Sequence, residues 1–208
     1  MLQYFKMHKF VYPKNKILNM PLTQFIQKLE ELGTMSDDVK LQFHSFSSVL
    51  QLEKKKTILK QGTLCNKIWF LASGSIRMYR IENNKDITLH LITHSRFFTD
   101  LIALTEQSPS TLQIETIDPC TIIVLNAKEL QKLLDTDLPS ERIGRKLYQQ
   151  LLFEETKRLQ DSIFLSANER YIKLIASAPE IFQKIPQKHI ASYLHIKPET
   201  LSRIRKQN

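Results

Sequence analysis

The feature that most constrains the fold of this 208-residue chain is a change of hydrophobic period near Val49. Before it, apolar residues recur every three or four positions, whereas from Val49 to Leu125 they fall in short β-branched and aromatic runs. Turn signals such as Ser73-Gly74 and Asp118-Pro119 separate these runs. Several short strands at such spacing predict a β-barrel or jelly roll. The predicted strands are 57–59, 67–71, 75–80, 87–92, 112–116 and 120–125.

Helical patterns flank and interrupt the strands. Residues 22–32 place apolar side chains on one side of an expected amphipathic helix that ends at Gly33, and Ser36 is suited to cap a second helix. Residues 98–104 and 127–134 read as two further short helices. The chain is therefore expected to be α+β rather than all-β.

After Pro139 a helical pattern continues to about Ile163, which corresponds to about 25 residues and a length of roughly 37 Å. One small domain does not cover so long a helix, so we expect a second copy of the chain to pack along it; packing on its own barrel is the alternative. The predicted dimer interface is Ile143, Leu147, Leu151 (or Leu152) and Leu159.

The segment 185–206 predicts two short helices joined by a tight turn. Ile190 and Leu194 share one face of the first helix, and Leu201 and Ile204 share one face of the second. Pro198 suits the opening turn of that second helix. The segment has the shape of a helix-turn-helix, although two ordinary packed core helices with a basic end would give a similar pattern.

The outward side of the second helix carries donors and acceptors suited to base edges and phosphates in a major groove. Six Lys or Arg residues and one Glu lie between Lys184 and the end of the chain, giving this segment +5 of the chain's formal net charge of +9. Motif and charge together predict DNA binding. The exposed residues are expected to be Glu199, Thr200, Ser202, Arg203 and Arg205 or Lys206.

Several classes of protein do not fit the sequence. No run of about 18 apolar residues is present, so no membrane span is expected, and the N-terminus lacks the pattern of a secretory signal, which favours a cytoplasmic location. Cys65 and Cys120 are too few for a disulfide framework or a four-thiolate cluster. His90 and His94 would lie about 13 Å apart along a strand, too far to share a metal. We therefore expect no metal, no cofactor and no enzymatic activity.

The order of helices, strand-rich barrel, inserted short helix, long helix and terminal helix pair resembles the catabolite activator protein (Crp/Fnr) family of bacterial transcription regulators. The resemblance covers roughly residues 22–208. Its most specific parts are Lys60-Gln61-Gly62, Leu71-Ala72-Ser73-Gly74-Ser75-Ile76 and the segment from Ile190 to Arg203 with Glu199-Thr200.

The resemblance implies that Glu199 and Arg203 read bases. Arg pairs bidentately with guanine and Glu accepts from cytosine, each contact contributing about 1–3 kcal/mol of discrimination. Gln187 and Lys188 look like phosphate contacts. The predicted DNA-binding set is Gln187, Lys188, Lys197, Glu199, Thr200, Ser202, Arg203 and Lys206.

The resemblance also implies a cyclic-nucleotide-binding-like barrel, but the expected ligand residues differ here. Where cyclic-nucleotide-binding members carry a Gly-Glu pair and then an Arg-Ser pair, this chain has Thr99-Asp100 and Ser110-Thr111. Without that Arg, a buried phosphate has no fixed cation, so cyclic nucleotide binding is not expected. The degenerate pocket is predicted to involve Thr99, Asp100, Leu101, Ser110, Thr111, Glu155 and Thr156.

The predicted organisation is an arm (1–21), a jelly-roll sensor domain (22–138), a dimerisation helix (139–165) and a helix-turn-helix domain (166–208). A homodimer that regulates transcription, with double-stranded DNA and an unidentified small-molecule effector as partners, is the function this order implies. A ligand-binding or protein-interaction module that does not read DNA is the alternative. The family usually continues with a β-hairpin wing, which is not seen before Asn208, so weaker DNA binding is expected.

Overall fold

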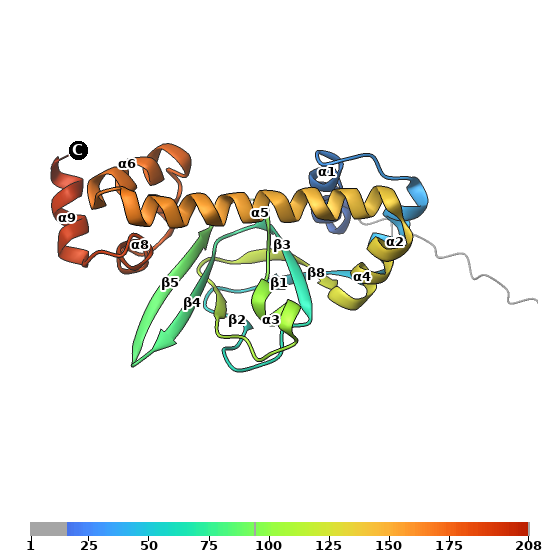
Figure 1. Cartoon of the computed structure of the whole chain (residues 1–208), viewed down its shortest axis with the longest axis horizontal. Coiled ribbons are helices and arrows are strands. Elements are labelled where there is room, and N and C mark those ends of the chain that lie inside the picture. Colours follow the sequence, from blue (N-terminus) through green and yellow to red (C-terminus); the bar gives the residue numbers. More distant parts are fainter. Residues whose placement is uncertain (1–15, 94, 208) are drawn as a thin grey trace, which may run out of the picture.

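The computed structural model describes residues 16–93 and 95–207, in which a β-barrel and a C-terminal helical domain lie along one long helix (Figure 1). The strands are β1 (Ser47–Leu52), β2 (Thr57–Leu59), β3 (Lys67–Ser73), β4 (Ile76–Glu82), β5 (Lys85–Ile92), β6 (Arg96–Phe98), β7 (Gln113–Thr116) and β8 (Cys120–Asn126). The helices are α1 (Lys16–Glu30), α2 (Asp37–Phe46), α3 (Leu101–Glu106), α4 (Ala127–Thr136), α5 (Leu138–Phe164), α6 (Ala167–Ser177), α7 (Ile181–Lys184), α8 (Gln187–Tyr193) and α9 (Pro198–Gln207).

The strands form two four-stranded antiparallel sheets, ordered β1-β8-β3-β6 and β2-β7-β4-β5. Apolar side chains from both sheets meet in one core cluster, which includes Trp69 and Leu71 from β3 and Met78 and Ile114 from the other sheet. The alternating segment of the sequence therefore folds as the expected two-sheet barrel. None of the helices in the described part of the chain combines the length and apolar character that crossing a membrane requires.

Strand β3 is covered on both faces, which explains its continuous apolar run. Trp69 and Leu71 point into the barrel core, while Phe70 joins a second cluster with the N-terminal helices and the first half of α5. In that cluster Phe25 of α1 makes edge-on contacts with Phe70 and Phe97, with ring centroids 5.7 Å apart in both pairs. The N-terminal helices thus fix the start of α5 on the outer face of one sheet.

A third cluster joins the C-terminal domain to the other sheet. Leu91 of β5 and Ile117 pack with Tyr171 and Leu174 of α6 and with Ile190 of α8. In Figure 1 the long helix α5 spans the molecule, with α1, α2 and α4 at one end and α6, α8 and α9 at the other. The C-terminal domain therefore rests on the barrel as well as on α5.

Several elements differ from the sequence prediction: α3 begins at Leu101 rather than Phe98, and β6 and α7 were not predicted. Helix α1 begins at Lys16 and contains Pro21, whereas the pattern placed the helix start after Pro21 because proline favours a first helical turn. The predicted arm is therefore helical over 16–21, and residues 1–15 lie outside the described part of the chain. Strand β1 was not predicted, because its residues are half-buried or exposed and show no strong apolar alternation.

The close packing of the turn before β4 can be tested by substituting Gly74. Gly74 has φ +100°, and an added Cβ would lie 2.5 Å from the carbonyl oxygen of Pro119 and 2.6 Å from Sγ of Cys120. Because both the backbone conformation and the contact are unfavourable, Gly74→Ala should lower the free energy of unfolding by more than about 3 kcal/mol. Gly62→Ala is the control, since Gly62 has φ +85° but open space around it and should cost only about 1–2 kcal/mol. Equal midpoints in urea for the two variants would contradict this assignment.

Candidate nucleic-acid interface

Helices α8 and α9 meet at a sharp turn with defined backbone geometry. His195 adopts a left-handed conformation with φ 54°, and the Ile196 amide donates to the carbonyl of Ala191 over 3.0 Å. This is the type of bond that closes a helix C-terminus. Ala191 is fully buried in one cluster with Leu201 and Ile204, so its small side chain lets the two helices pack closely.

The apolar residues of α9 face this cluster and leave its polar residues outside. Spacings of three and four place the exposed side chains of Glu199, Ser202, Arg203 and Lys206 on one face of the helix. Thr200 is half-buried. Gln187 and Lys188, at the start of α8, and Lys197, just before α9, are exposed. The predicted DNA-binding residues are thus accessible, with Thr200 the least so.

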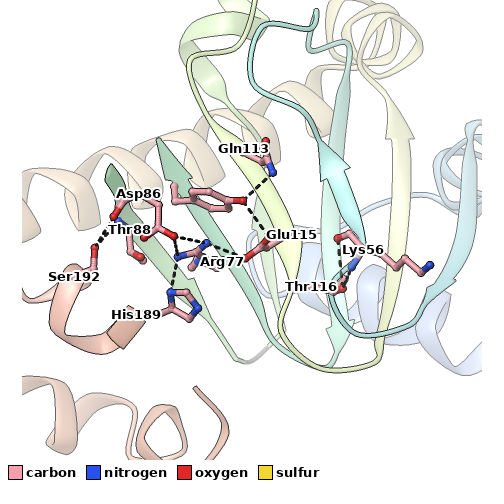
Figure 2. A network of polar contacts seen from close by, with 10 residues as sticks. Lys56, Arg77, Asp86, Thr88, Gln113, Glu115, Thr116, His189 and Ser192 are labelled. Atoms are coloured by element: carbon pink, nitrogen blue, oxygen red, sulfur yellow. Dashed lines mark hydrogen bonds and ion pairs between the residues drawn. The ribbon is translucent and has the colours of Figure 1, made fainter. Parts of the chain in front are cut away.

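The α8–α9 helix pair contacts the barrel through a buried arginine. Arg77 of β4 is 3% exposed and lies against His189 of α8, donating from Nη1 to the ring Nδ1 (Figure 2). Its charge is balanced by Glu115, 2.9 Å away, and Asp86, 3.2 Å away. The guanidinium also lies over the ring of Tyr79, 3.7 Å from the centroid. One cation therefore connects three strands of the barrel (β4, β5 and β7) to the first helix of the pair.

Two further polar contacts cross the same junction. The amide of Thr88 on β5 donates to Oγ of Ser192 on α8 over 2.9 Å, as Figure 2 shows. The hydroxyl of Thr93 donates to the Glu180 carboxylate, just before α7, over 2.7 Å. The first bond holds α8 against β5, and the second holds the segment before α7 against the end of β5.

The contact between the barrel and α8 favours the neutral form of His189, and His90 on β5 is affected in the same way. Burial lowers the pKa of His189 from 6.5 to about 4, and the charges of Arg77 and Lys188 act in the same direction, against Asp86 and Glu115. Neutral His189 accepts the hydrogen bond from Arg77, whereas a protonated ring would place two cations in contact. Burial likewise lowers the pKa of His90 on β5 to about 4.

Sequence reasoning did not identify Arg77, His189 or Ser192 as functional. Arg77 and His189 lie far apart in the chain, and no local pattern indicates that they meet. The one available signal was a charged residue inside an otherwise apolar run, Ile76-Arg77-Met78, which is unusual for a buried strand.

The residues of the degenerate barrel pocket are only partly brought together. Asp100 and Ser110 are both buried, and the Ser110 hydroxyl donates to the Asp100 carboxylate over 2.7 Å, while Asp100 also accepts from the Ala103 amide. A carboxylate is thus fixed beside Ser110, the position where the resemblance expects an arginine. Thr99 donates to the Lys67 carbonyl.

The other predicted pocket residues lie elsewhere. Leu101 and Thr111 are exposed. Glu155 and Thr156 lie on α5, where Glu155 pairs with Arg158 over 3.0 Å and Thr156 donates to the Leu152 carbonyl. Among the described residues, no group of three or more His, Cys, Asp or Glu side chains is arranged to hold a metal ion.

The residues of the predicted dimer interface are divided between two sides of the long helix. Ile143 is 3% exposed and Leu147 packs against the same cluster, so both face their own barrel, while Leu151 is half-buried. Ile143 is accordingly reassigned to the core. Four exposed apolar side chains lie on another side of the helix, and they are Tyr148, Leu152, Leu159 and Ile163.

Comparisons with known proteins agree with this architecture. Residues 49–137 match the family described as cyclic nucleotide-binding domain. CLP of Xanthomonas campestris, described as a c-di-GMP responsive global regulator, is 17% identical with a TM-score of 0.62, and the match covers 83% of this chain and 91% of CLP.

Two further solved structures have the same fold. FixK2 of Bradyrhizobium japonicum is 16% identical with a TM-score of 0.64, over 77% of this chain and 83% of FixK2. A transcriptional regulator of the Crp/Fnr family from Eubacterium rectale is 15% identical with a TM-score of 0.64, over 83% of each chain. No curated protein matches this chain. At these identities the structures show a shared fold.

The junction histidines predict a pH dependence of stability. Because the pKa of His189 is lowered from 6.5 to about 4, its contribution is complete above pH 6.5 and is lost as the pH falls toward 4. The melting temperature should therefore fall over this window, with a loss on the order of 2 kcal/mol from His189 alone. His189→Gln should reduce that fall. The same fall in wild type and His189→Gln would contradict the assignment.

Proposed function

Since residues 49–137 match the cyclic nucleotide-binding domain family and the chain shares the fold of Crp/Fnr regulators, we propose that it is a DNA-binding transcription regulator of that type. The single observation that carries the proposal is the α8–α9 pair, whose apolar side is buried and whose polar, basic side is open. In this proposal α9 is the recognition helix of a helix-turn-helix and the protein acts in the cytoplasm. No catalytic step is part of it.

Each exposed group of the pair has a role suited to its chemistry. Arg203 offers a planar donor fork for guanine and Glu199 offers an acceptor for the amino group of cytosine. Ser202 lies on the same face, and its hydroxyl can either donate or accept a hydrogen bond. Lys188, Lys197 and Lys206 neutralise phosphates and supply affinity that depends on salt, together with Gln187 and Thr200 as neutral contacts.

The exposed stripe on α5 supports a dimer as the working form. At about 100° per residue, Tyr148, Leu152, Leu159 and Ile163 fall within an arc of about 60° on the 27-residue helix. Such a stripe is suited to pack against the same stripe of a second copy, as in a coiled coil. A two-fold pair of recognition helices then reads two half-sites of one operator.

The barrel is proposed not to bind a cyclic nucleotide in the family manner. The buried Asp100 carboxylate sits beside Ser110, and a cyclic phosphate placed there would meet a fixed negative charge rather than an arginine. An effector, if it regulates this protein, therefore needs another site.

The recognition helix gives the first test of function. Arg203→Ala should weaken binding to a fragment selected from genomic DNA by about 5- to 150-fold and relax the preference at one base pair, because the lost bidentate contact contributes about 1–3 kcal/mol. Arg80→Ala, an exposed arginine of the barrel, is the matched control and should bind like wild type. Electrophoretic mobility shifts at several salt concentrations measure both. Equal affinity for all three proteins, with no dependence on salt, would exclude DNA reading by α9.

The dimer is tested separately on α5. Leu152→Glu places a charge in the centre of the exposed stripe and should convert the protein to a monomer in sedimentation velocity, with a loss of operator affinity of at least 10-fold. Ile102→Glu, which alters an exposed residue of α3 instead, should remain a dimer. A wild-type protein that sediments as a monomer at operator-binding concentrations would refute the dimer.

A further inference from the structure

A cavity of about 480 Å³ lies where the barrel, the long helix and the C-terminal domain meet. Its walls come from β5 and Arg96, from the second half of α5, from α6 with Ile181, and from the end of α8. This volume is in the range of sites for small organic ligands. Of the residues predicted for the family's nucleotide pocket only Glu155 lines it, so it is a different site.

The polar lining carries more positive than negative charge. Each of its three carboxylates already has a cation: Glu154 pairs with Arg96, Glu155 with Arg158, and Asp161 with Lys173. Among the described residues, Lys157 and Arg170 also line the cavity and form no ion pair. The cavity therefore retains two cations that lack a counterion from the protein.

Arg170 of α6 is held in place without being neutralised. Its Nη1 donates to the Leu165 carbonyl over 2.6 Å and its Nη2 to the Leu194 carbonyl over 3.0 Å, while its Nε is buried and makes no hydrogen bond within the described part of the chain. Carbonyl groups orient the guanidinium but bring no net charge. A fixed, partly desolvated cation with a free donor favours an anion.

The remaining wall is apolar. Leu89 and Leu91 of β5, Leu174 of α6 and Ile181 line the cavity, and they offer a surface for a hydrocarbon body. Burial lowers the pKa of His195, and the positive charges of Arg158 and Arg170 lower it further, in agreement with a positive potential at this place.

We propose that this cavity binds a small organic anion, whose acidic group pairs with Arg170 and Lys157 and whose apolar part lies against the leucine-rich wall. The occupant contacts both the barrel and the C-terminal domain, so its binding stabilises the arrangement in which the two are docked. This regulatory consequence rests on the proposed function of α9, whereas the binding itself does not.

The test is isothermal titration of the full chain, without DNA, with octanoate, octyl phosphate and the uncharged octan-1-ol. We expect either anion to bind one per chain and at least 10-fold more tightly than octan-1-ol; the tighter of the two identifies the acidic group. Equal affinity for the anions and the alcohol, or no binding of either anion, would overturn the proposal.

Variants locate the site. Arg170→Gln keeps a donor but removes the charge, and it should weaken octanoate binding at least 10-fold without changing octan-1-ol binding. Arg145→Gln, an exposed arginine of α5 outside the cavity, is the matched control and should bind like wild type. Unchanged octanoate binding in Arg170→Gln would refute the assigned role of this arginine.

Two further variants do not disturb the bonds of Arg170. Lys157→Gln, at an exposed position, should weaken octanoate binding about 3- to 10-fold. Ser177→Trp places a large ring in the cavity from an exposed position on α6 and should abolish binding of both octanoate and octan-1-ol. Retained binding in Ser177→Trp would place the ligand elsewhere. Because DNA is absent, these results are independent of the Arg203→Ala test.

Discussion

The position of the α8–α9 pair depends on the buried guanidinium of Arg77. A charge at 3% exposure is tolerated only with close partners, and Arg77 has two carboxylates, an aromatic face and the ring of His189. Three of these four partners belong to the barrel and one to the C-terminal domain. If α8 moved away from the barrel, His189 would leave Arg77 and the guanidinium would be exposed to water. The solvation of Arg77 and of its carboxylate partners would then change together.

The long helix gives the molecule two separate apolar faces. Its first half packs Ile143 and Leu147 against the N-terminal helices and one sheet, and its exposed stripe is left for a second copy. Its second half forms one wall of the charged cavity and leads directly into α6. Any movement of α5 relative to the barrel would therefore change three contacts together. These are the proposed dimer contact, the walls of the cavity and the docking of the α8–α9 pair on the barrel. This connection is a physical basis on which an effector would control DNA binding.

Local patterns were sufficient to predict most of the fold. The strand alternation and the proline and glycine signals each act over a few residues, so a short stretch of sequence is enough to indicate them. The predicted interface on α5 combined Ile143, which is covered by the barrel side, with Leu159, which is exposed. Regular helical spacing does not tell which apolar positions the barrel covers. The Arg77–His189 contact joins distant segments, and the charged cavity is lined by residues of β5, β6, α5, α6, α7 and α8. Neither leaves a local signal, because both depend on how the C-terminal domain docks.

In the proposed function, two copies of α9 read one DNA duplex together. Hydroxyl-radical footprinting of the wild-type protein on a selected genomic fragment tests it most directly. We expect two protected patches related by a two-fold axis, on one side of the DNA, with centres about 34–36 Å apart or a multiple of this distance. A fragment bound without any footprint, or with one unpaired patch, would contradict it.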